Sequence, residues 1–285
     1  MSLAALLLVA CAAGLHAGWN AMAKRGSDQI VFLWCATLAS TVFVTPFGLW
    51  SLAHEGFPRA ALPFVVATIV VHALYFYALG RAYASAAYSL VYPVARGLGV
   101  ALVPLIALVV FDEHLSPVGT LGVALVVAGI ATLHLLPGHA ADVPAVRAGR
   151  GLRWPIVVGL TIATYSLVDK AGVARMNPVP YIMLMEAGCA LLGLPLLLTR
   201  GGAVRRELVG WRTIVLAGVM STLAYTLVLF AFRMSKTGYV VAARELSIVL
   251  SAVIGSLWLR EARLAPRLAG AAIVLAGVVC IAVAR

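Results

Sequence analysis

The chain repeats part of its own sequence. Positions 94–136 align without a gap onto positions 242–284, at an offset of 148. The matched pairs are Arg96 with Arg244, Glu113 with Glu261, Gly122 with Gly270, and Ala128-Gly129 with Ala276-Gly277. Chance seldom preserves the spacing from arginine to glutamate in sequence that is otherwise rich in Leu, Val and Ala. The pattern therefore indicates a duplication, in which two related copies build the two halves of one fold.

The composition shows which kind of fold is duplicated. Hydrophobic residues make up 63% of the chain and charged residues 11%, with a mean hydropathy of +1.05, which is typical of a polytopic membrane protein. A membrane span takes about 20 apolar residues in a helix, because every backbone N–H and C=O has to be satisfied within the segment. The sequence contains ten such runs. We therefore predict an all-α polytopic membrane protein with ten transmembrane helices.

The ten runs divide evenly between the two copies. The spans expected in the first half are 3–22, 30–52, 61–80, 85–110 and 118–136, and those in the second half are 154–172, 180–198, 211–232, 238–259 and 266–284. Residues 137–153 contain two prolines, three glycines and three arginines and form the longest connection. This gives three parts: a first five-helix repeat at 1–136, an inter-repeat loop at 137–153, and a second repeat at 154–285.

An odd number of spans per copy predicts that the second copy crosses the membrane upside down relative to the first. Further matched positions support the repeat: Trp19 and Lys24 correspond to Tyr165 and Lys170, with the same spacing in each copy. Inverted repeats with a site at their interface, near the bilayer midplane, are a recurrent construction of transporters. Because the first span has this counterpart inside the chain, we interpret it as a retained helix and not as a cleaved signal peptide.

Charge and cysteine content exclude several other classes of protein. The formal net charge is +11, but the basic residues are scattered among loops without an aromatic-interleaved patch, so we expect interfacial contact with anionic lipid and no nucleic-acid partner. All four cysteines lie in predicted spans without metal-binding spacing, which predicts small buried side chains with free thiols. They are Cys11, Cys35, Cys189 and Cys280. We predict no cofactor and no metal.

The distribution of basic residues predicts the orientation of the chain in the membrane. The connections after the odd-numbered spans carry 13 Lys and Arg residues, whereas the opposite side carries six. The positive-inside bias then predicts cytoplasmic odd-numbered connections and both termini outside.

Short motifs carry a resemblance to a known family. They are W-x4-K at Trp19 to Lys24, Y-S-x2-D-K-x-G from Tyr165 to Gly172, and the turns D-E-x-L at 112–115 and R-E-x-R-L at 260–264. With ten apolar spans in two five-helix repeats, the chain resembles the ten-helix, EamA-like branch of the drug/metabolite transporter superfamily over nearly its whole length. That resemblance implies a carrier, such as the amino-acid exporters of the YddG type, the sugar carriers or the nucleotide-sugar antiporters. Several such relatives have their termini in the cytosol, which differs from the expectation from charge.

Polar groups inside the predicted spans are candidates for a substrate site, because they are expensive in lipid unless they face a cavity or a partner. The candidates for substrate binding are His16, Trp19, Asn20, His72, Tyr75, Tyr88, Tyr92, Arg96, Tyr165, Asp169, Tyr225 and Arg244. Several share a helix face at spacings of three or four residues. Arg96 and Arg244 have two interpretations: they line a cavity, or their long side chains extend to the membrane interface. The two histidines, likewise, either carry protons or are hydrogen-bonded core residues.

Glu186 is the candidate for proton coupling. It lies about six residues into an apolar span, where burial disfavours the charged form of a carboxyl group, and this suits a group that exchanges protons. The alternative is a structural acid neutralised by a cation such as Lys24, Arg96 or Arg244.

The sequence thus predicts a transporter and not an enzyme. No paired catalytic set, mid-span lysine or ATP-binding loop is present. We expect a multi-pass protein of the bacterial inner (plasma) membrane, monomeric or homodimeric, that exports amino acids or related small metabolites by alternating access around a central cavity, by secondary active or facilitative transport. An aromatic pocket with arginines suits a small zwitterion, whose carboxylate binds Arg96 or Arg244. The alternatives are a proton-coupled exporter of drugs or organic cations, with Glu186 or Asp169 as counter-charge, and a sugar or nucleotide-sugar carrier.

Overall fold

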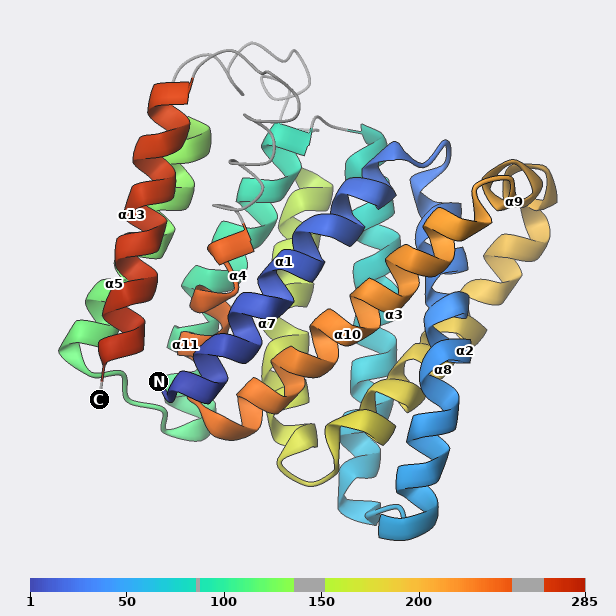
Figure 1. Cartoon of the computed structure of the whole chain (residues 1–285), viewed down its shortest axis with the longest axis horizontal. Coiled ribbons are helices and arrows are strands. Elements are labelled where there is room, and N and C mark those ends of the chain that lie inside the picture. The colour runs from blue at the N-terminus through green and yellow to red at the C-terminus, as the bar shows by residue number, and fades with distance from the viewer. Residues whose placement is uncertain (86–87, 136–151, 248–263, 285) are drawn as a thin grey trace.

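The computed structural model describes residues 1–85, 88–135, 152–247 and 264–284, and every element in these ranges is a helix. Figure 1 shows them as a bundle of long helices. Their bounds are α1 (Leu3–Arg25), α2 (Gln29–Glu55), η1 (Arg59–Ala61), α3 (Leu62–Ser85), α4 (Tyr88–Phe111), α5 (Pro117–Leu135), α7 (Arg153–Val173), α8 (Pro178–Thr199), α9 (Gly201–Leu208), α10 (Trp211–Met234), α11 (Thr237–Ala243) and α13 (Leu264–Val283).

Seven helices among the described residues are long and apolar enough to cross a membrane. They coincide with the predicted spans one to four and six to eight, so the all-helical, multi-pass part of the prediction is confirmed. Spans five and ten correspond to α5 and α13, whose apolar stretches are shorter. Span nine begins as α11, and its part from residue 248 onward lies outside the described residues. The sequence did not predict α9, a short helix on the connection between α8 and α10.

Matching caps begin the helices α2 and α8. The Asp28 carboxylate accepts from the first backbone N–H groups of α2, and the Asn177 side chain does the same for α8. Each capping residue also donates a hydrogen bond to a carboxylate from the other half of the chain. The Asp28 backbone N–H donates to Glu207 at 2.7 Å, and the Asn177 side-chain amide donates to Glu55 at 3.0 Å. Both ends of the α2–α8 pair are thereby tied across the two halves.

The most extensive helix contacts join one half of the chain to the other. The helix α1 packs on α10, α3 packs on α7, α2 packs on α8, and α5 packs on α13. Figure 1 shows α5 and α13 side by side at one edge of the bundle and the α1–α10 pair across its front. The core of the protein therefore lies between the halves.

Glycines allow α5 and α13 to approach at backbone distance. A Cβ atom built on Gly122 meets the carbonyl oxygen of Gly277 at 2.8 Å, and one built on Gly277 meets the carbonyl oxygen of Gly122 at 2.6 Å. Further along the helices, a Cβ on Gly129 meets the carbonyl oxygen of Gly270 at 2.9 Å. Small residues at such crossings are how membrane helices pack closely, since lipid provides no hydrophobic force between them.

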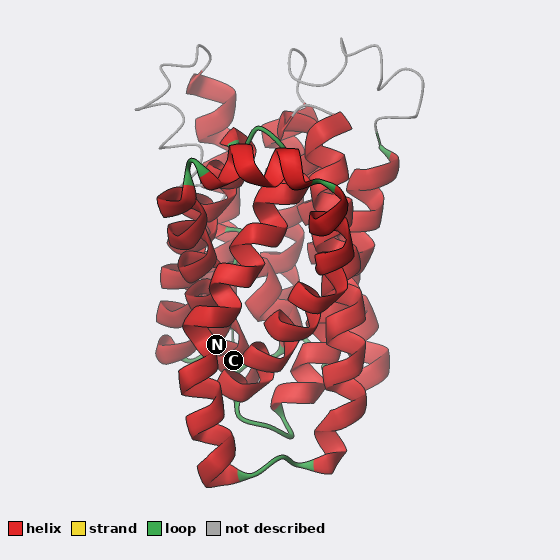
Figure 2. Cartoon of the chain, turned by 90° about the vertical axis from the view of Figure 1, so that its right-hand side faces the viewer, coloured by secondary structure: helices red, strands yellow, loops and turns green. Residues whose placement is uncertain are grey.

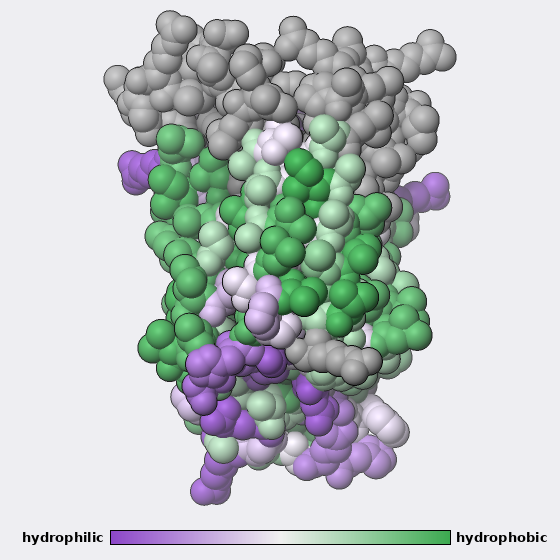
Figure 3. All heavy atoms as spheres, turned by 90° about the vertical axis from the view of Figure 1, so that its left-hand side faces the viewer, coloured by the Kyte–Doolittle hydropathy of each residue, from purple (hydrophilic) through white to green (hydrophobic). Residues whose placement is uncertain are grey.

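The outer surface is apolar around the bundle and polar at its ends. Large hydrophobic side chains face outward, for example Val109 (84% exposed) and Leu198 (74% exposed). Figure 3 shows a broad hydrophobic band on the face with α5 and α13, with hydrophilic residues gathered toward one end. Figure 2 places both termini on the same side of the bundle, where the Met1 ammonium group donates to the Ala284 carbonyl at 3.0 Å. The band has the chemistry of a lipid-facing surface.

A network of polar contacts joins the C-terminal ends of α4, α7 and α10. Glu113 accepts from the backbone N–H of Thr237 at 2.6 Å and from its hydroxyl at 2.9 Å, and Lys170 lies 3.7 Å from the same carboxylate. The Lys170 ammonium group also donates to the carbonyl oxygens of Phe232 and Ser235, at 2.5 and 2.8 Å. The network joins the end of α7, the α4–α5 connection and the α10–α11 connection.

Candidate functional site

A cavity of about 40 Å³ lies between the two halves of the chain. Its walls come from α1, α3, α4, α7, α8 and α10 and from Arg244, which directly follows α11. The residues predicted for substrate binding that line it are His16, Trp19, Asn20, His72, Tyr75, Arg96, Tyr165, Tyr225 and Arg244, and Glu186 lines it as well. Helix periodicity on the separate spans thus pointed to side chains that one cavity brings together.

One predicted residue, Asp169, is not among those that line the cavity. Asp169 is completely buried beside it. The side chains of Tyr88 and Tyr92 lie outside the described residues.

Sequence reasoning missed part of the wall. Phe76 lies one helical turn after His72 and shares its face, so the same periodicity rule identifies it. Tyr83 donates to the Asn20 side-chain carbonyl at 3.2 Å. Apolar wall residues such as Val158 and Ile162 resemble any other core position in sequence, and no local signal distinguishes them.

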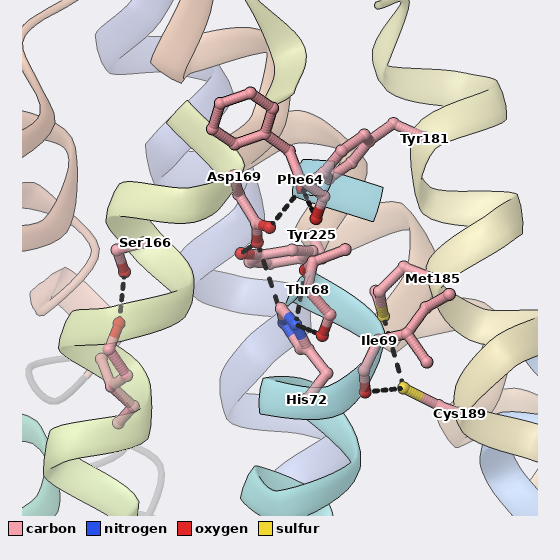
Figure 4. Close-up of polar contacts among 11 residues, drawn as sticks. Phe64, Thr68, Ile69, His72, Ser166, Asp169, Tyr181, Met185, Cys189 and Tyr225 are labelled. Atoms are coloured by element: carbon pink, nitrogen blue, oxygen red, sulfur yellow. Dashed lines mark hydrogen bonds and ion pairs between the residues drawn. The ribbon is translucent and has the colours of Figure 1, made fainter. Parts of the chain in front are cut away.

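Asp169 is the centre of a polar cluster on one flank of the cavity (Figure 4). Its two carboxylate oxygens accept separately, one from the Tyr181 hydroxyl at 2.8 Å and the other from the Tyr225 hydroxyl. The His72 Nε2 atom lies 3.9 Å from the second oxygen, and Thr68 contacts the Nδ1 atom of the same ring at 2.9 Å. Asp169 is therefore a bonded group that holds α3, α7, α8 and α10 together, and it is a poor counter-charge for a substrate.

Aromatic rings surround His72 on the cavity side. The imidazole stacks on Tyr165 at a centroid distance of 4.3 Å and meets Tyr225 edge-on at 5.3 Å. Tyr75 and Tyr165 are themselves in edge contact at 5.5 Å. Such packing gives a rigid, largely apolar wall that accepts an apolar or aromatic ligand group.

Glu186 contrasts with Asp169. Its side chain is buried, one oxygen accepts a long bond of 3.4 Å from the Thr222 hydroxyl, and the other oxygen has no hydrogen-bond partner in the described part of the chain. No described ion pair joins it to Lys24, Arg96 or Arg244, the cations considered as structural partners. A buried carboxyl group with a free oxygen requires a proton or an incoming cation.

The two matched arginines have different surroundings. Both are buried, so neither extends to the interface. Arg96 lies in a bonded network: its Nε atom is 3.5 Å from the Glu245 carboxylate and its Nη2 atom donates to the Ser247 hydroxyl at 3.2 Å. Arg244 stands over the Tyr225 ring at 5.7 Å, and its Nε and Nη1 atoms have no hydrogen-bond partner among the described residues.

Metal chemistry finds no support in the described residues, which contain no cluster of His, Cys, Asp or Glu able to hold an ion. The four cysteines have free thiols, as predicted. The prediction that all of them are buried was wrong for Cys11, which is exposed on the apolar outer surface of α1, and Cys280 is only partly covered.

Comparisons with known proteins relate both halves of the chain to membrane transporters. Residues 149–283 match the profile of the EamA-like transporter family, and residues 28–126 match that of the Small Multidrug Resistance protein. A solved structure described only as "Crystal structure of protein" superimposes with a TM-score of 0.74 at 16% identity, covering 98% of this chain and 96% of that chain, which shows a shared fold. No curated protein matches the chain. Each half of the chain is thus similar to a family of membrane transporters.

Proposed function

We propose that the protein is a secondary transporter that exports amino acids or related small metabolites across the bacterial inner membrane, by alternating access around the central cavity. One observation carries this proposal: the aromatic cavity holds two guanidinium nitrogens of Arg244 and one carboxyl oxygen of Glu186 that have no hydrogen-bond partner among the described residues. A small zwitterion brings a carboxylate and an ammonium group together and so satisfies both with one ligand.

The proposed architecture is ten transmembrane helices in two inverted five-helix repeats. In the proposed repeat, α1 corresponds to α7, α2 to α8, α3 to α10 and α5 to α13. Exchange of the two halves therefore converts the α1–α10 contact into the α7–α3 contact, and it leaves the α2–α8 and α5–α13 contacts unchanged. The glycine contacts have the same property, since Gly122 matches Gly270, Gly129 matches Gly277, and each packs on the partner of the other. Both features support a two-fold relation between the halves, which is the arrangement that lets them rock about a central site.

Glu186 is the proposed coupling group. Its free oxygen accommodates either a proton or the ammonium group of the substrate, but not both. Competition between the two makes release of one a condition for binding the other, and this links export of the substrate to entry of protons.

Flux into proteoliposomes tests the proposal. We expect uptake of a labelled neutral amino acid that exceeds that of a labelled quaternary amine, with accumulation driven by an imposed pH gradient. Glu186→Gln is expected to retain exchange of the amino acid and to lose the response to the gradient, whereas the control Asp112→Asn, in a carboxylate that is 90% exposed, retains both. Intact gradient dependence in Glu186→Gln contradicts the coupling role, and absence of flux for every solute contradicts transport itself.

Export of organic cations is the second candidate. It is favoured by the free carboxyl oxygen of Glu186 and by the match of residues 28–126 to the Small Multidrug Resistance protein. Arg244→Ala separates the two classes, because the arginine serves a carboxylate but not a quaternary amine. Loss of amino-acid flux with unchanged amine flux supports the first, and equal effects on both favour the second.

A further inference from the structure

The tautomer of His16 follows from one hydrogen bond. The indole N–H of Trp19 donates to His16 Nδ1 at 3.0 Å. Because an indole nitrogen only donates, Nδ1 has to present its lone pair, and the ring proton of the neutral histidine resides on Nε2. His16 therefore enters the cavity as a hydrogen-bond donor.

This donor is unused in the structure. His16 is 5% exposed, it lines the cavity, and its Nε2 atom has no hydrogen-bond partner in the described residues. The backbone at His16 has a further contact, since the Asn20 side-chain amide donates to the His16 backbone carbonyl at 2.8 Å and the Tyr83 hydroxyl donates to Asn20 in turn. A buried N–H group without an acceptor is costly, so its presence in a cavity points to a ligand that accepts.

Arg244 offers unused donors in the same cavity. Its Nε and Nη1 atoms are buried without a partner among the described residues, although Arg96 nearby is engaged with Glu245 and Ser247. The two side chains thus combine one uncompensated positive charge with N–H groups from opposite halves of the chain.

We propose that His16 and Arg244 together form a binding site for the carboxylate group of a monoanion or zwitterion, and that Trp19 is a positioning residue that keeps the His16 Nε2–H available. One free positive charge balances one negative charge, so a dianion such as a phosphate ester leaves a buried charge uncompensated. The inference rests on the proposed function only for the identity of the transported solute, because the site itself is defined by its donors.

Binding of simple aromatic acids to the full chain in detergent tests the site without transport. The probes are benzoate, its uncharged isostere benzamide, and the dianion phenyl phosphate, measured by isothermal titration calorimetry. We expect benzoate to bind at least about tenfold more tightly than either of the other two, since a hydrogen bond to a charged group accounts for at least that factor. Benzamide or phenyl phosphate binding as tightly as benzoate overturns the proposal.

Two amide substitutions distinguish the contribution of His16 Nε2 to benzoate binding from that of Nδ1. The side-chain amide of His16→Gln reaches the Nε2 position and retains a donor there, whereas that of His16→Asn reaches only the Nδ1 position. We expect benzoate affinity within about threefold of wild type for His16→Gln and a loss of about tenfold for His16→Asn. Because both variants remove the same ring, a shared folding defect does not produce this difference, and equal affinities overturn the role of Nε2.

Trp19→Phe tests the positioning role. It removes the indole donor, so we expect a loss of about fivefold in benzoate affinity in the wild-type background and no loss in the His16→Gln background, where no tautomer has to be set. A loss of equal size in both backgrounds means that Trp19 serves packing alone. Arg244→Lys, which retains the charge without the Nε donor, is expected to lose about tenfold.

Failure of this inference is distinguishable from failure of the proposed function. Benzoate binding with the expected variants, but no exchange of any amino acid in proteoliposomes, leaves the carboxylate site standing and refutes amino-acid transport. Amino-acid exchange with no difference between benzoate and benzamide has the opposite meaning, since the carboxylate is then held elsewhere.

Discussion

Arg96 and Arg244 match in the internal repeat, yet the structure predicts opposite effects when each is replaced. Arg96→Met removes the cation that lies 3.5 Å from Glu245, whose side chain is 2% exposed. Breaking a buried ion pair by removal of one partner leaves an uncompensated charge and costs about 3–5 kcal/mol. Arg244→Met removes a charge that has no ion-pair partner among the described residues, so we expect its free energy of unfolding to stay within about 1 kcal/mol of wild type or to rise.

The assay is reversible unfolding in mixed micelles of increasing SDS content, followed by circular dichroism. The double variant Arg96→Met/Glu245→Leu removes both charges of the pair, and we expect it to recover to within about 1 kcal/mol of wild type. Equal destabilisation by Arg96→Met and Arg244→Met refutes the assignment of Arg96 as the paired arginine. A double variant as unstable as Arg96→Met shows that the lost stability came from packing and not from the ion pair.

Three further predictions concern the helix contacts. Gly122→Leu forces a side chain into the α5–α13 contact and should lower the free energy of unfolding by at least about 2 kcal/mol in the same assay. The control Gly14→Leu, at a position where a Cβ atom meets nothing within 4 Å, should change this free energy little. Equal effects of the two variants contradict the close packing of α5 and α13. Asp169→Asn keeps one acceptor oxygen and places an amide NH2 against the other phenol hydroxyl, so it should cost about 2–4 kcal/mol in thermal unfolding, more than Tyr181→Phe, which removes one donor. The reverse order excludes Asp169 as the centre of the cluster. Lys170→Met should accelerate hydrogen exchange in the α10–α11 connection, and unchanged exchange there means that the ammonium contacts do not hold it.

The sequence predicted the helices well because lipid imposes a simple rule on them. A span has to be about 20 apolar residues long, so runs such as that of α2 are visible without any knowledge of the fold. The helix α9 was not predicted because it is short and lies outside the apolar runs, with two glycines at its start and three charged residues in a row near its end. Its place is fixed by a tertiary contact, through the bonds from Ser27 and Asp28 to Glu207, which no local pattern reveals.

The candidate site was predictable in its members but not in its connections. Polar residues are rare in apolar spans, and this rarity alone pointed to Arg96, Asp169 and Glu186. Which carboxyl group is satisfied depends on residues from other helices: Tyr181 and Tyr225 occupy both oxygens of Asp169, while Glu186 receives only the long bond from Thr222. Such partners depend on helix packing, which the spacing along one span does not specify.

The different surroundings of the two arginines trace back to the repeat itself. At the offset of 148, Glu245 and Ser247, the partners of Arg96, match Gly97 and Gly99 of the first copy. Arg244 therefore has no equivalent acid or hydroxyl from the first half, and Gly99 is instead closely packed against Ile162. One copy supplies a carboxylate and a hydroxyl where the other supplies only backbone. The divergence of these two positions gives Arg96 a carboxylate and a hydroxyl partner, whereas the Nε and Nη1 atoms of Arg244 have no hydrogen-bond partner among the described residues.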